Sequence, residues 1–88
     1  MIGDAIRQAV DAAQQARPDL KARLQDSGAF ALLANERPLA RIGVMLKDTV
    51  WLESAGMFQL IPSSRAEPAV LSALLLHAIE DSERALSA

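Results

Sequence analysis

The sequence predicts a small α+β domain, because apolar residues recur at helical spacing near both ends and at alternating spacing in the middle. The chain has 88 residues, the size of one folding unit, so we expect a single domain over residues 1–88. The predicted architecture is a three-stranded antiparallel meander packed with N-terminal helices and a C-terminal helix.

The N-terminal part is expected to be helical as far as the middle of the chain. A first helix over Ile2 to Ala16 is predicted by the spacing of its apolar positions, Ile2, Ile6, Ala9, Val10 and Ala13. Pro18 either ends this helix or opens a second one at its first position. Asp19 to Leu33 then predicts a helix, a break at residues 26–28 and a further helical turn. Asn35 is expected to adopt a left-handed cap conformation.

Three short runs then predict a meander: Arg41–Leu46, Val50–Glu53 and Met57–Ile61. We expect three-residue loops over residues 47–49 and 54–56, the second because Gly56 stands where a left-handed residue is needed. This register puts seven apolar residues on one face, namely Ile42, Val44, Leu46, Val50, Leu52, Phe58 and Leu60.

On the other face Trp51 is predicted to lie between Met45 and Met57. Either a helix covers this face and Trp51 belongs to the core, or Trp51 is an exposed aromatic anchor flanked by adaptable methionines. The second arrangement is typical of a protein-binding hot spot.

The last predicted helix begins near Pro68, and its apolar band is wider than a helix wetted on one side needs. A small alanine-rich domain often gains burial by self-association, so we expect a homodimer. The candidate protein-interface residues lie on the second sheet face and on this helix: Met45, Trp51, Met57, Gln59, Ile61, Leu74 and Leu76.

No residue pattern indicates catalysis, so we expect no enzyme activity, no catalytic residues, no cofactor and no metal. His77 is the single histidine and the chain has no cysteine, too few ligands for a zinc site in one chain. Its carboxylate neighbours one helical turn on, Glu80 and Asp81, are expected to be solvated charges. The sequence also lacks a glycine-rich phosphate loop.

The net charge and the hydropathy limit the classes of partner that we expect. A net charge of −2 disfavours an electrostatically driven nucleic-acid binder. The longest apolar run, within residues 68–79, is shorter than the ~20 residues needed to span a bilayer. We therefore expect no membrane partner and a cytoplasmic location.

The order of helix, three-strand meander and long apolar helix resembles the front half of small secretion chaperones, which are acidic dimers joined by a helix. That resemblance implies a chaperone-like binder of unfolded or secreted protein segments. Our principal expectation is instead a small non-catalytic protein-interaction module, an adaptor, inhibitor or regulatory subunit that binds a protein partner. A weak nucleic-acid-binding regulator is a further alternative.

Overall fold

The computed structural model describes residues 1–87 and confirms the α+β class. One antiparallel sheet has five strands in the order β1-β2-β3-β4-β5, so each strand lies beside its neighbour in the chain. The elements are α1 (Ile2–Ala16), β1 (Lys21–Leu24), β2 (Phe30–Ala34), β3 (Arg37–Met45), β4 (Thr49–Ser54), β5 (Met57–Pro62), a 3₁₀ turn η1 (Ser63–Arg65) and α2 (Pro68–Ser87).

The helices predicted over Asp19 to Leu33 are wrong, because this segment forms the hairpin β1–β2. Its apolar run Phe30–Ala34 fits a buried strand as well as a helix, since so short a run carries no periodicity that separates the two. Tertiary pairing decides, because β2 lies between two neighbouring strands. The sheet therefore has five strands and not the predicted three.

The left-handed conformation predicted for Asn35 is confirmed, but this residue lies in the turn between β2 and β3. Asn35 is left-handed, with a φ of 52°, but Glu36 is left-handed too, with a φ of 64°. Two consecutive left-handed residues make the tight turn of a two-residue hairpin, which here joins Ala34 to Arg37. Asn35 thus closes a hairpin and does not cap a helix.

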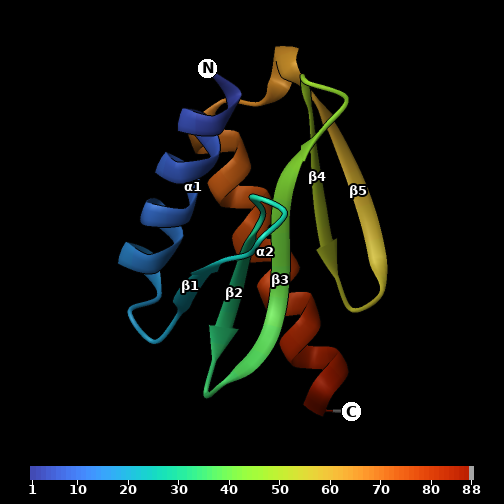
Figure 1. Ribbon diagram of the computed structural model, residues 1–88. Coiled ribbons are helices and arrows are strands. Elements are labelled where there is room, and N and C mark those ends of the chain that lie inside the picture. The colour runs from blue at the N-terminus through green and yellow to red at the C-terminus, as the bar shows by residue number, and fades with distance from the viewer. Residues whose placement is uncertain (88) are drawn as a thin grey trace.

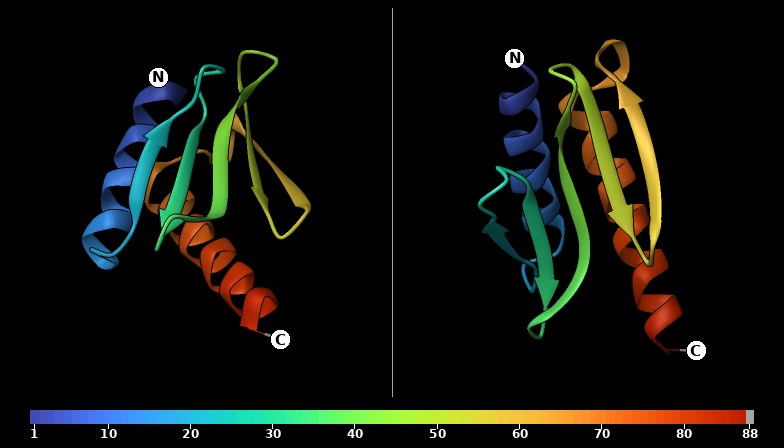
Figure 2. Two further views of the ribbon diagram at one scale, coloured as in Figure 1. Left: turned by 60° about the horizontal axis from the view of Figure 1, so that its bottom comes forward. Right: turned by 45° about the vertical axis from the view of Figure 1, so that its right-hand side comes forward.

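Both helices lie on the same side of the sheet (Figures 1 and 2). α1 contacts β1 and β3, α2 contacts β3 and β4, and the two helices contact each other. The α1 side of the core is built largely from small residues, Ala5, Ala9 and Ala13, which let a neighbouring helix approach closely. The bulkier fully buried side chains come from the sheet and α2: Leu32, Ile42, Val50, Leu71, Leu75 and Ile79.

The ends of the two helices are tied together by Arg17, the residue that follows α1. Its guanidinium donates hydrogen bonds of 2.8 Å to both carboxylate oxygens of Glu83 on α2, and it also contacts Asp19. Hydrogen bonding to Arg17 lowers the pKa of Glu83 below its ordinary value. α1 is therefore held against the C-terminal half of α2 by charge as well as by apolar packing.

The loop between β3 and β4 has three residues as predicted, but it lies one position earlier in the chain. Met45 pairs with Thr49 and Val44 pairs with Val50, so the loop is Leu46-Lys47-Asp48. Leu46 and Lys47 have positive φ, whereas Thr49 stays in the strand. The physical reason is that a β-branched residue resists the left-handed conformation.

The predicted loop between β4 and β5 is wrong by one residue. Ser54 pairs with Met57, which leaves a two-residue turn of Ala55 and Gly56. Both turn residues are left-handed, with φ of 50° and 79°, as the favoured hairpin turn requires. The one-residue difference turns every side chain of β5 to the opposite face of the sheet from the one predicted.

Candidate functional site

The face of the sheet opposite α1 and α2 is the candidate site, and we call its β3–β5 part the free face. Cross-strand pairing fixes its rows, because residues that face each other share a side of the sheet. Within residues 1–87, no helix lies over this face (Figure 2). The free face consists of Arg41, Gly43, Met45, Thr49, Trp51, Glu53, Phe58, Leu60 and Pro62.

Trp51 is the centre of the free face and lies against Gly43, its partner on β3. A β-carbon at position 43 would come within 2.7 Å of Cζ2 of Trp51, so only glycine leaves room for the indole here. Trp51 is consequently half-buried by the sheet itself, without help from a helix.

Arg41 and Phe58 flank the indole on neighbouring strands. The Arg41 guanidinium carbon lies 5.4 Å from the Trp51 ring centroid, within range of a cation–π interaction. Arg41 Nε also donates a 2.8 Å hydrogen bond to Oε1 of Glu53. The Phe58 and Trp51 rings lie 6.1 Å apart and are tilted by 51°. Gly43, Arg41 and Phe58 thus contact the indole in the free chain, without a partner.

The other large apolar side chains of the free face are open to solvent. Phe58 is 65% exposed, Leu60 is 60% exposed and Met45 is 39% exposed. Leu60 pairs with Trp51 and Phe58 contacts it, so these residues and Trp51 form one contiguous apolar surface. Surfaces of this kind on small proteins commonly mark sites of interaction.

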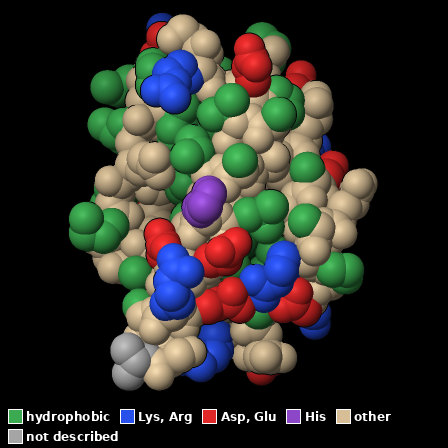
Figure 3. Space-filling view, turned by 180° about the vertical axis from the view of Figure 1, so that it is seen from behind, with side chains coloured by type: hydrophobic (Ala, Val, Ile, Leu, Met, Phe, Trp, Pro, Cys, Tyr) green, Lys and Arg blue, Asp and Glu red, His purple; other side chains and the backbone are tan. Residues whose placement is uncertain are grey.

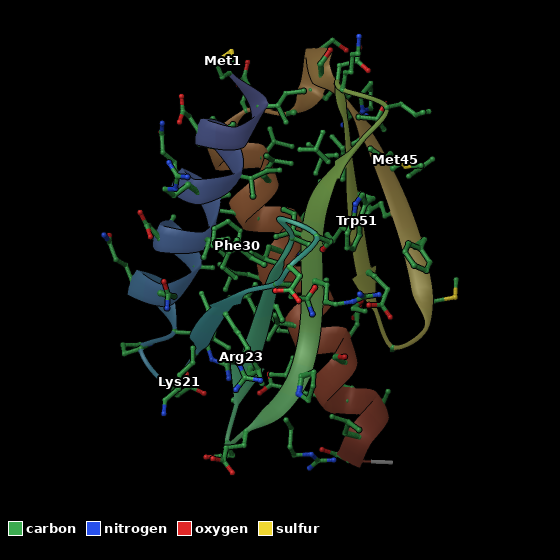
Figure 4. The ribbon with its side chains drawn as sticks, viewed as in Figure 1. Met1, Lys21, Arg23, Phe30, Met45 and Trp51 are labelled. Carbon is green, nitrogen blue, oxygen red and sulfur yellow. The ribbon has the colours of Figure 1, made fainter. Side chains whose placement is uncertain are left out.

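The structure brings together only part of the predicted interface. Met45 and Trp51 share the free face (Figure 4). Met57, Gln59 and Ile61 point to the helix side instead, and Ile61 is a core residue that is 4% exposed. On α2 two further predicted residues, Leu74 and Leu76, are half-buried against the core.

Sequence reasoning missed Phe58 and Leu60 because it assigned them to the core. Either face of β5 offers apolar side chains, so alternation alone cannot decide which face points inward. The useful signal is the turn, since a residue pair ending in glycine can form a two-residue hairpin as readily as three residues can form a bulged one. Only the two-residue turn places Ile61 opposite Val50.

The helix side carries His77, the single histidine of the sequence. A groove of about 520 Å³ runs between the β4–β5 hairpin and α2, and it is lined by Ser54, Met57, His77 and Asp81 among others. Seen from behind, charged side chains gather over the lower part of this side (Figure 3). Among the described residues no group of three or more histidine, cysteine, aspartate or glutamate side chains could hold a metal ion.

Neither helix within residues 1–87 combines the length and apolar character that crossing a membrane requires. No protein-family model, curated protein or solved structure matches this chain.

Proposed function

We propose that this chain is a small non-catalytic protein-interaction module, acting as an adaptor, inhibitor or regulatory subunit, that binds its partner through the free face. One observation carries the proposal: a preformed aromatic cluster at Trp51 and Phe58 is left uncovered on the side of the sheet opposite the one that packs against both helices. Tryptophan, arginine and an apolar surround are the composition of binding hot spots.

The pre-ordering of Trp51 supports the same proposal. Its contacts with Gly43, Arg41 and Phe58 hold the indole in place in the free chain. A partner that packs on it therefore does not have to order it, which lowers the entropic cost of binding.

The distribution of charge argues for a protein over a nucleic acid. Arg41 is already paired with Glu53, so its charge is neutralised beside the aromatic cluster. Lys21 and Arg23 lie on β1, three strands away from Trp51 on β4 (Figure 4), although Arg23 lines a cavity together with Arg41 and Glu53. Single-stranded nucleic acid would need cations along the aromatic surface, and such binding would weaken steeply as salt is raised.

Affinity capture from the native host with matched lysine substitutions tests the proposal. Met45→Lys places a charge on the free face, and Leu86→Lys places one at a comparably exposed site, 47% against 39%, on α2. We expect Met45→Lys to lose the captured protein and Leu86→Lys to keep it, with both variants folded. The captured protein should change the fluorescence of Trp51, the only tryptophan. Equal capture by both variants would contradict the proposal.

A chaperone-like binder of unfolded segments is the second candidate, and the open edge of β5 favours it. Four consecutive residues of this edge strand, Met57 to Leu60, are exposed, so an extended segment could add to the sheet there. This candidate predicts that the native protein keeps a chemically unfolded client from aggregating at equimolar concentration. A specific interaction module would not do so.

A further inference from the structure

The two edges of the sheet differ in how they are protected. β1 has only four residues and carries Lys21 and Arg23, the kind of short, charged edge that discourages pairing with another sheet. β5 has six residues, none of them charged, and its first four are exposed. An apolar edge without these protections is a site where another strand adds.

From this edge we infer that β5 pairs antiparallel with β5 of a second copy of the chain, so that the two sheets become one. The inference rests on the proposed function, because it names the partner at the β5 border of the free face. The strand that adds to this edge is β5 of a second copy. Two copies of the edge match each other in their outward backbone hydrogen-bonding groups, their side chains and the charges beside them.

The backbone of β5 sets which residues are available. Ser54 and Met57 flank a two-residue turn and form its closing hydrogen-bonded pair, so Met57, Gln59 and Ile61 direct their backbone groups to β4. Phe58 and Leu60 direct theirs outward. A second strand can therefore bond at these two positions.

One register satisfies both positions in both copies. With Phe58 opposite Leu60 of the second copy, and the reverse, all four outward residues are paired. If Leu60 lay opposite Leu60 of the second copy, Phe58 would lie opposite Pro62, which has no N–H to donate. Placing Phe58 opposite itself would leave Leu60 facing the turn at Gly56. The favoured register is thus centred on Gln59, which lies opposite Gln59 of the second copy.

The side chains agree with this register. The two β5 strands would meet at a joint, and there Phe58 of one copy would contact Leu60 of the other on the free face. Cross-strand pairs of an aromatic and an aliphatic side chain stabilise a sheet. On the helix side, the two Gln59 amides would face each other and can exchange hydrogen bonds. The two free faces would continue into each other with Trp51 on either side of the joint.

The flanking charges are complementary under the same two-fold symmetry. Arg65 lines a groove with Gln59 and Pro62 at the C-terminal end of β5. Asp81 lines a groove with Met57 at the N-terminal end. An antiparallel pair brings the C-terminal end of one β5 beside the N-terminal end of the other, so each Arg65 approaches an Asp81 whose carboxylate also contacts Arg84 on its own helix. Because Asp81 keeps its contact with Arg84, this approach favours the antiparallel orientation but does not by itself set the register.

Single-cysteine cross-linking of the full chain tests the pairing. The sequence has no cysteine, so each variant carries one thiol. In the inferred register, cysteines at position 59 lie opposite each other with Cα atoms about 4.5 Å apart, within reach of a disulfide. Cysteines at position 57 lie about 13 Å apart along the joint, which is too far.

We expect Gln59→Cys to form a disulfide dimer on mild oxidation at least tenfold more completely than Met57→Cys. Both side chains are exposed on the same strand, which makes the second variant a matched control. Equal cross-linking of the two, or cross-linking of Met57→Cys alone, would overturn the register. A wild-type chain that stays monomeric by light scattering at high micromolar concentration would overturn the pairing.

A charge swap supplies an independent readout without cysteine. Phe58→Lys and Leu60→Glu, studied separately, should each weaken self-association at least tenfold. A mixture of the two should restore it, because the mixed dimer has one Lys–Glu pair and one native Phe–Leu pair. Lack of restoration in folded variants would count against the register. If the wild type is monomeric while Met45→Lys still loses its captured protein, the pairing fails and the proposed function stands.

Discussion

The Trp51 indole lies against Gly43 on the neighbouring strand, at a place where the smallest side chain would already collide with it. This relationship decides the shape of the free face. The indole can lie along the sheet because position 43 has no side chain, and the Phe58 ring lies next to it at a tilt of 51°.

Gly43→Ala tests this relationship. A methyl group would sit 2.7 Å from the indole, so Trp51 must move outward, and we expect a loss of stability of about 1–3 kcal/mol. Trp51 fluorescence emission should shift to longer wavelength as the ring becomes wetter. Gly3→Ala is the control, since no atom lies within 4 Å of that position, and it should leave the emission unchanged.

The register of β5 predicts opposite outcomes for two adjacent residues. Ile61→Ala removes a buried side chain and should lower the free energy of unfolding by about 2–4 kcal/mol in urea denaturation. Leu60→Ala removes an exposed one and should change it by less than about 0.5 kcal/mol at monomeric concentrations. A three-residue turn at residues 54–56 would reverse this order.

The contact between Arg17 and Glu83 predicts a pH-dependent contribution to stability. Because Arg17 lowers the pKa of Glu83, the contact stabilises the fold above the ordinary glutamate pKa and is lost as the pH falls through the folded-state pKa. The Glu83 side chain is 39% exposed, so solvent screening limits the effect to about 0.5–1 kcal/mol.

Glu83→Gln should therefore be less stable than the wild type at pH 7 and equal to it near pH 2. Asp81→Asn is the comparison, because its ion pair with Arg84 is highly exposed and lies within one helix. At monomeric concentrations Asp81→Asn should leave the free energy of unfolding within about 0.3 kcal/mol of the wild-type value at pH 7. A Glu83→Gln deficit that persists at pH 2 would mean that packing, and not charge, holds the helix ends together.

Leu46 predicts a gain in stability on substitution. It is 81% exposed and has a φ of 51°, a conformation that disfavours branched apolar side chains. Leu46→Asn should raise the free energy of unfolding by about 0.5–1 kcal/mol, since asparagine tolerates the left-handed region. Leu24→Asn, at an exposed strand position, should bring no such gain.

The parts of the fold that could be predicted from sequence are those with a clear period. The helix Ile2–Ala16 is confirmed at both bounds, because its buried residues recur at helical spacing. The C-terminal helix is confirmed from Pro68 onward. The β1–β2 hairpin could not be predicted, since Phe30–Ala34 is apolar throughout and built from good helix formers.

The prediction of the free-face residues depended on the turn between β4 and β5. Met45 and Trp51 were placed on one face correctly, because β3 and β4 keep the predicted side-chain alternation even though the loop is shifted. Phe58 and Leu60 were not, because both faces of β5 are apolar and the sequence Ser54-Ala55-Gly56 admits two turn lengths. Backbone conformation at Ala55, which no side-chain pattern reports, settled the question.

Solvent paramagnetic relaxation by NMR measures whether the sheet has an uncovered apolar face. With a soluble gadolinium chelate, we expect the methyl signals of Leu60 and Met45 to broaden strongly while those of Ile61 and Val50 stay sharp. Sharp Leu60 and Met45 signals together with a broadened Ile61 signal would mean that the free face is covered and that β5 has the opposite orientation.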